Sequence, residues 1–80
     1  MDTTFIRVRA ILVVLLGVDL QRVSMESRIM EDLEADQLDF TEVLMGVESE
    51  FGIQIPDGES ANLHTVGDLV NYIDSQTASA

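Results

Sequence analysis

The 80-residue sequence contains no cysteine, and this absence excludes several kinds of chemistry. Without thiols there is no disulfide, no thiolate zinc site and no cysteine nucleophile. Such a composition fits a reducing compartment, and we expect a cytoplasmic protein. Aromatic residues are also scarce, at 5%, whereas hydrophobic residues make up 46%. We therefore expect a single domain over residues 1–80, with a small core of aliphatic side chains.

Positive charge is the second scarcity. Four basic residues face 15 acidic ones, which gives a net charge of -11. A chain with this balance repels nucleic acid and anionic membranes, and it attracts basic protein surfaces. The last basic residue is Arg28, so acidic surface is concentrated in the later part of the chain.

Long hydrophobic runs are missing as well. The unbroken apolar run from Ala10 to Leu16 follows Arg7 and Arg9, an order that superficially suggests a signal peptide. The run is too short to span a bilayer, and no small-residue cleavage site follows it. We interpret it as part of a core helix and expect no membrane span.

The first helix is predicted from Thr3 or Thr4 to Leu16, with Asp2 or Thr3 as its cap and Gly17 after its end. A loop over residues 18–35 follows. It is long for a structureless connection, so its apolar residues should pack on the helices. These anchors are Val23, Ile29, Met30 and Leu33.

The second helix is predicted from Gln37 to Phe51. Asp36 is a good N-cap, and Asp39 and Glu42 place negative charge near the positive end of the helix dipole. Gly52 should end the helix. Its apolar stripe consists of Phe40, Val43, Leu44, Val47 and Phe51.

The last helix should start at Thr65, where Asp68 three residues on forms an acidic variant of the capping box. An extended link over residues 53–56 and a short helical turn over 57–62 are expected before it. Its apolar stripe consists of Val66, Leu69, Val70 and Ile73. Residues 75–80 are predicted to be a frayed tail. Together the segments predict an all-α fold, a small antiparallel bundle of three main helices plus one short helix.

The segment from Asp32 to Asp57 resembles the core of the acyl carrier proteins, and the resemblance extends over nearly the whole chain. Its matching pieces are Gly17-Val18, Glu31-Asp32-Leu33, Asp36-x-Leu38, Glu48-x-Glu50-Phe51-Gly52-Ile53, Ile55-Pro56-Asp57, Thr65-Val66-Gly67-Asp68 and Tyr72-Ile73. The family motif is Asp-Ser-Leu, and its serine holds the 4'-phosphopantetheine arm that carries acyl groups as thioesters. In this chain Gln37 stands at that serine's position.

A hydroxyl becomes a nucleophile when it loses its proton, and the amide of Gln37 cannot play that part at neutral pH. The resemblance therefore implies a carrier scaffold without its attachment atom, and we expect no cofactor in this form. Four other hydroxyls are unsuited to replace it. Thr41 should be partly packed, Ser24 and Ser27 lie in the loop, and Ser49 comes late in the second helix.

The resemblance also implies a partner-facing surface on the second helix. Its residues would be Asp36, Leu38, Glu42, Met45 and Glu48. Composition alone favours a solvated helix face for the acidic stripe, and Met45 could belong to the core. The stripe consists of Asp36, Asp39, Glu42, Glu48 and Glu50. With the resemblance, we favour docking to basic surfaces of acyl-chain synthesis or acyl-transfer enzymes. No calcium-loop spacing is present, so no metal site is expected.

Two further features leave alternatives open. His64 as a catalytic base would need a nucleophile and an orienting acid, which the sequence does not nominate; we expect it only to precede the last helix. In the first helix Val13, Val14 and Leu15 are adjacent, and one helix face cannot bury them all. They are either scattered surface aliphatics or a patch for a partner or a weak homodimer. We favour the patch.

The resemblance thus implies a non-enzymatic acyl-carrier-protein-like module of fatty-acid or polyketide-type biosynthesis, which we expect to act through protein contacts and to take no arm at Gln37. Two alternatives remain. The chain is a genuine carrier whose attachment serine has been engineered to glutamine, or it is a regulatory or interaction protein unrelated to acyl transfer.

Overall fold

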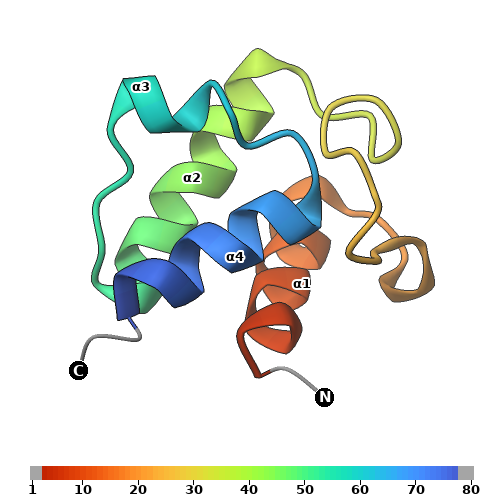
Figure 1. The fold of residues 1–80 in the computed structure, drawn as a ribbon. Coiled ribbons are helices and arrows are strands. Elements are labelled where there is room, and N and C mark those ends of the chain that lie inside the picture. Colours follow the sequence, from red (N-terminus) through yellow and green to blue (C-terminus); the bar gives the residue numbers. More distant parts are fainter. Residues whose placement is uncertain (1–2, 78–80) are drawn as a thin grey trace.

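The computed structural model describes residues 3–77, which form an all-helical fold with one isolated antiparallel bridge between Arg28 and Thr65 (Figure 1). The elements are α1 (Thr3–Leu16), the short 3-10 helix η1 (Leu20–Arg22), α2 (Gln37–Phe51), α3 (Asp57–Ser60) and α4 (Val66–Thr77). The predicted bundle of three main helices plus one short helix is confirmed. Within residues 3–77, no helix is long and apolar enough to cross a bilayer.

The core lies where α1 packs against both α2 and α4 (Figure 1). The predicted apolar stripes of α2 and α4 supply much of it, although Leu44 and Phe51 are only half-buried, and α1 and the loop supply the rest. Its fully buried side chains are Val8, Leu12, Ile29, Val43, Val47, Val66, Leu69, Val70 and Ile73. Burial of one such side chain is worth about 1.5–3 kcal/mol, so these aliphatic contacts supply most of the driving force for folding.

Local signals determine the ends of α2. The carboxylate of Asp36 accepts the backbone N–H of Asp39 at 2.8 Å, and the carboxylate of Asp39 accepts the backbone N–H of Asp36 at 3.2 Å. This reciprocal pair satisfies two donors that the first turn leaves unpaired. At the other end Gly52 has a left-handed backbone, with φ 67°, which glycine adopts without a steric penalty. Both predicted ends of α2 are confirmed.

The long loop of residues 17–36 is fixed to the start of α4. The N–H of Ile29 donates to the carbonyl of His64 at 3.0 Å, and the N–H of Gly67 donates to the carbonyl of Met25 at 2.8 Å. A Cβ on Gly67 would lie 2.9 Å from that Met25 oxygen, so the close approach requires glycine there. The loop therefore positions the segment that leads into α2.

Two predictions about packing and order are wrong in part. Three of the four loop anchors are buried, but Met30 is 40% exposed because it lies at the edge of the cavity described below.

The frayed tail does not begin at Ser75, since α4 continues to Thr77. The hydroxyls of Ser75 and Thr77 donate to carbonyls one turn earlier, at 2.7 and 3.0 Å, a bond compatible with helix. The rest of the predicted tail, residues 78–80, lies outside the described residues, and so does Asp2, one of the two residues predicted to cap the first helix.

Candidate functional site

Gln37 is the first residue of α2, directly after the Asp36 cap, and its side chain is exposed. The capping box fixes the backbone on both sides of it. The carbonyl of Gln37 accepts the hydroxyl of Thr41 at 3.0 Å, one turn further along. The position predicted to carry the family's arm is therefore at the capped start of a helix and is exposed to solvent.

The chemistry available at residue 37 differs from that of a serine. The amide has two N–H donors and one carbonyl acceptor, and it offers no hydroxyl oxygen. A phosphopantetheine arm is joined to protein through such an oxygen, so residue 37 does not fit covalent attachment of the group. Hydrogen bonding to a bound molecule is what this side chain can do.

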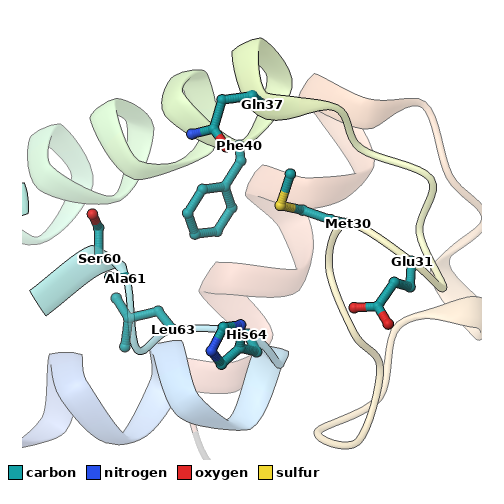
Figure 2. A pocket seen from close by; sticks show the side chains of 8 residues that line it. All are labelled: Met30, Glu31, Gln37, Phe40, Ser60, Ala61, Leu63 and His64. Atoms are coloured by element: carbon teal, nitrogen blue, oxygen red, sulfur yellow. The ribbon is translucent and has the colours of Figure 1, made fainter.

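A cavity of about 340 Å³ lies beside Gln37, and Figure 2 shows its side chains from the loop, α2 and the segment before α4. Its lining residues are Met30, Glu31, Gln37, Phe40, Ser60, Ala61, Leu63 and His64. A second hollow of about 250 Å³ shares Gln37, Phe40 and Ser60 with it and continues toward Met45. The space between α2 and α3 is thus a trough on both sides of Phe40, with Gln37 at its edge. Sequence reasoning missed this trough, because its walls come from four separate segments.

The other hydroxyls are placed in different surroundings. Thr41 is exposed, contrary to the predicted partial packing, and it lines the second hollow together with Gln37. Its hydroxyl nevertheless donates to the carbonyl of Gln37. Ser27 is buried. Its hydroxyl donates to the carbonyl of Arg22 at 2.9 Å, and its oxygen lies 3.1 Å from the hydroxyl oxygen of Ser24. The loop hydroxyls therefore hold the loop together.

The predicted partner surface on α2 is well exposed at its apolar members. Leu38 is 69% exposed and Met45 is 62% exposed, so the core interpretation of Met45 is wrong. Glu42 is also exposed, and within the described residues it forms no ion pair or hydrogen bond. These three residues are free to meet a partner. We call Asp36, Leu38, Glu42, Met45 and Glu48 the acidic face of α2.

The other two members of this face have structural partners. A carboxylate oxygen of Glu48 accepts the backbone N–H of Ile55 at 2.7 Å, which ties the link after α2 back onto the helix. Asp36 is occupied by the capping box. Charge on both remains available to a partner, but replacing either side chain also disturbs the fold.

The two carboxyl groups with a lowered pKa, Asp68 and Asp32, are not among the residues that line the cavity at Gln37. Backbone N–H groups of Thr65 and His64 donate to Asp68 and hold the pKa of that carboxyl below its usual range. The guanidinium of Arg28 does the same to the pKa of Asp32 by a side-chain hydrogen bond. His64 precedes the capped start of α4, as predicted. Within residues 3–77, no group of three or more His, Asp or Glu side chains is arranged to hold a metal ion.

A family match and two similar proteins point to the same family. The family described as "Phosphopantetheine attachment site" matches residues 7–73. A protein called "Acyl carrier protein" from Campylobacter jejuni (strain RM1221) is 47% identical over 72 residues, which cover 90% of this chain and 94% of the relative. Another of that name, from Clostridium acetobutylicum, is 44% identical over 73 residues, covering 91% of this chain and 95% of the relative.

Proposed function

This chain belongs to the acyl carrier protein family, and we propose that it is a carrier-like module of fatty-acid or polyketide-type biosynthesis that cannot take the phosphopantetheine arm at Gln37. Acyl carrier proteins carry acyl groups and interact with biosynthetic enzymes; they are carriers and not enzymes. The family uses 4'-phosphopantetheine. In this form we propose that no cofactor is bound and that the protein acts through its contacts.

One observation carries the proposal: the scaffold around residue 37 is complete while its side chain lacks a nucleophilic oxygen. Asp36 caps α2, Leu38 points into solvent, and Gln37 stands between them at the first helical position. The same observation supports the alternative that the chain is a genuine carrier whose serine has been engineered to glutamine. Under either alternative, one substitution should restore attachment.

The test is intact mass after incubation with coenzyme A and a broad-specificity phosphopantetheinyl transferase. The unchanged chain should gain nothing, because no hydroxyl at residue 37 can attack the pyrophosphate. The Gln37→Ser variant should gain one arm, and Gln37→Ala should not. A mass gain of one arm on the unchanged chain would contradict the proposal. If Gln37→Ser stays unmodified while a known carrier is modified beside it, residue 37 is not the attachment position.

The proposed partners are the basic surfaces of acyl-chain synthesis or acyl-transfer enzymes, which the acidic face of α2 would meet. Exposed aliphatics among carboxylates support this, because basic partners are attracted at long range and the apolar side chains supply contact. We also propose weak self-association through α1, where Val14 and Leu15 are exposed and Val13 is half-buried. The proposed location is the cytoplasm, with no nucleic-acid partner.

A further inference from the structure

The surface segment of residues 56–62 contains α3, which two irregular links join to α2 and α4 (Figure 1). The side chains that flank this segment, Ile55 and Leu63, are buried, whereas no residue between them is buried. The single turn of α3 therefore lacks a packed face of its own. Because one helical turn is marginally stable without packing, this segment opens more readily than the core helices do.

Within this segment Asp57 is followed by Gly58, the one place in the sequence where an aspartate precedes a glycine. Within residues 3–77, the N–H of Gly58 and the carboxylate of Asp57 form no hydrogen bond and no ion pair. A Cβ on Gly58 would have no neighbour within 4 Å, so the space around the nitrogen is open. A bond from this nitrogen to the carboxyl carbon of Asp57 closes a five-membered ring, and nothing in the surroundings blocks it.

The other aspartates of the described chain lack this combination. Five of them accept hydrogen bonds through their carboxylates: Asp32, Asp36, Asp39, Asp68 and Asp74. Asp19 makes no capping hydrogen bond, but Leu20 follows it, and a side chain on the following residue crowds the attacking nitrogen. Asp57 is thus the described aspartate with both a free carboxylate and an unhindered neighbour.

We propose that Asp57 and Gly58 form a self-modification site, at which Asp57 converts to isoaspartate through a cyclic imide. The nitrogen of Gly58 bonds to the carboxyl carbon Cγ of Asp57. One carboxyl oxygen leaves as water, with the N–H proton and one proton taken from solvent. Water then attacks the backbone carbonyl of residue 57, and the original peptide bond breaks. The chain now runs through Cβ and Cγ, a free carboxylate remains on Cα, and the total mass is unchanged.

The conversion inserts one extra carbon into the backbone of α3. The N–H groups of Glu59 and Ser60 both donate to the carbonyl of Pro56, at 2.9 and 3.0 Å. Both bonds close rings that include residue 57, so the extra carbon disturbs the only turn of this helix. Asp57 and Ser60 also line the second hollow beside Gln37, so the conversion alters that wall of the trough.

Storage of the whole chain in warm buffer near neutral pH for several weeks tests the site. Peptide mapping with electron-transfer fragmentation distinguishes isoaspartate from aspartate of the same mass and assigns its position. We expect isoaspartate to accumulate at residue 57. Gly58→Ala should slow its formation at least about fivefold, because a Cβ on residue 58 crowds the nitrogen and restricts the backbone. The alanine fits the open space and should leave the fold intact, which circular dichroism checks.

Two substitutions of Asp57 itself serve as controls. Asp57→Glu should form no such product, since the same attack would have to close a six-membered ring. Asp57→Asn should reach the same imide faster with release of ammonia, and mass spectrometry detects the amide becoming a carboxylate. The proposal is overturned if residue 57 gains no isoaspartate, if Asp19 converts as fast as Asp57, or if Gly58→Ala converts as fast as the unchanged chain.

Amide hydrogen exchange of the converted protein tests the effect on α3. The amides of Glu59 and Ser60 should exchange faster than in the unconverted chain, while that of Phe40, which donates to Asp36 in α2, should keep its protection. Unchanged exchange at Glu59 and Ser60 would contradict the predicted change in the trough wall. Conversion at Asp57 does not depend on the carrier role proposed above, so its failure would leave the result of the arm-transfer test unaffected.

Discussion

At the scale of single residues, Asp68 shows how one carboxylate fixes the segment before α4 to the first turn of that helix. It accepts the N–H of Thr65 at 3.1 Å and that of His64 at 3.0 Å, while the hydroxyl of Thr65 accepts the N–H of Asp68 at 3.0 Å. This is the acidic capping box that the sequence predicts. It starts α4 beside the residues that line the cavity at Gln37.

The pKa of Asp68 predicts a pH-dependent stability. Because the folded-state pKa lies below the ordinary value of 3.8, the ionised carboxyl stabilises the fold above that value, and the contribution is lost as pH falls through the folded-state pKa. The free energy of unfolding of Asp68→Asn should therefore be lower than that of the unchanged chain at neutral pH, and the difference should shrink on acidification. Urea titrations at several pH values measure it. A difference that stays constant or grows toward low pH would contradict this assignment.

The hydroxyl of Thr65 makes a separate contribution to the same cap. Thr65→Ala should lower the free energy of unfolding by about 1 kcal/mol, the usual cost of losing a capping side chain. The loss should be largely independent of pH, unlike that of Asp68→Asn. Thr65→Ser, which keeps the hydroxyl, is the control and should retain most of the stability. Equal losses in the serine and alanine variants would show that the methyl group, rather than the cap, is what matters.

At the scale of elements, local patterns predict the three main helices correctly and tertiary contacts account for what they miss. Caps such as Asp36 and stripes of apolar residues are short-range signals, so they are readable in sequence. The hydrogen bond from the N–H of Ile55 to the carboxylate of Glu48 joins the link after α2 to the helix itself, and no sequence pattern predicts it. The exposure of Met30 depends on the cavity beside it. The extra turn of α4 is a local exception, in which the hydroxyls of Ser75 and Thr77 bond to carbonyls of the helix itself.

The site is predictable to the same extent. The Asp36-x-Leu38 motif is local and places Gln37 correctly at the start of a helix. The trough between α2 and α3 assembles residues from four segments and could not be predicted. The sequence also treats Glu42 and Glu48 as equivalent docking residues, whereas the structure gives Glu48 an internal partner and leaves Glu42 free of one.

This difference sharpens the docking prediction for α2. Glu42→Lys should weaken binding to a basic synthase partner at low salt, mainly through slower association, while leaving the thermal stability nearly unchanged. Surface plasmon resonance at two salt concentrations measures both the association rate and its salt dependence. Glu26→Lys is the matched control, since it makes the same change in net charge at an exposed loop residue. Equal rates for the unchanged chain and Glu42→Lys would favour a merely solvated helix face.

Glu48 requires a pair of variants. Glu48→Gln should keep an oxygen for the N–H of Ile55 and remove only the charge, whereas Glu48→Lys removes both. The lysine variant should therefore lose more stability than the glutamine variant in thermal unfolding. If the two melt at the same temperature, the bond to Ile55 contributes little.

At the scale of the whole molecule, repulsion between acids opposes folding. Four basic residues cannot neutralise 15 acidic ones, and no basic residue follows Arg28. Each repulsive pair is worth about 1 kcal/mol or less in water, but a small domain has only about 5–15 kcal/mol of stability against their sum.

The melting temperature should rise with added salt, whose screening length is about 10 Å at 0.1 M. It should rise further with calcium or magnesium at equal ionic strength, by bridging of neighbouring carboxylates. A melting curve indifferent to both would show that the acids lie too far apart to interact.

The whole molecule combines a carrier scaffold, an acidic face on α2 and a residue 37 without a nucleophilic oxygen. The most direct test of this combination is the intact mass of the protein purified from its native host. We predict a mass that the encoded amino acids account for in full, with Gln37 encoded in the gene and no arm attached. A mass greater by one phosphopantetheine arm would contradict the account, because the chain would then be charged in the cell despite its glutamine.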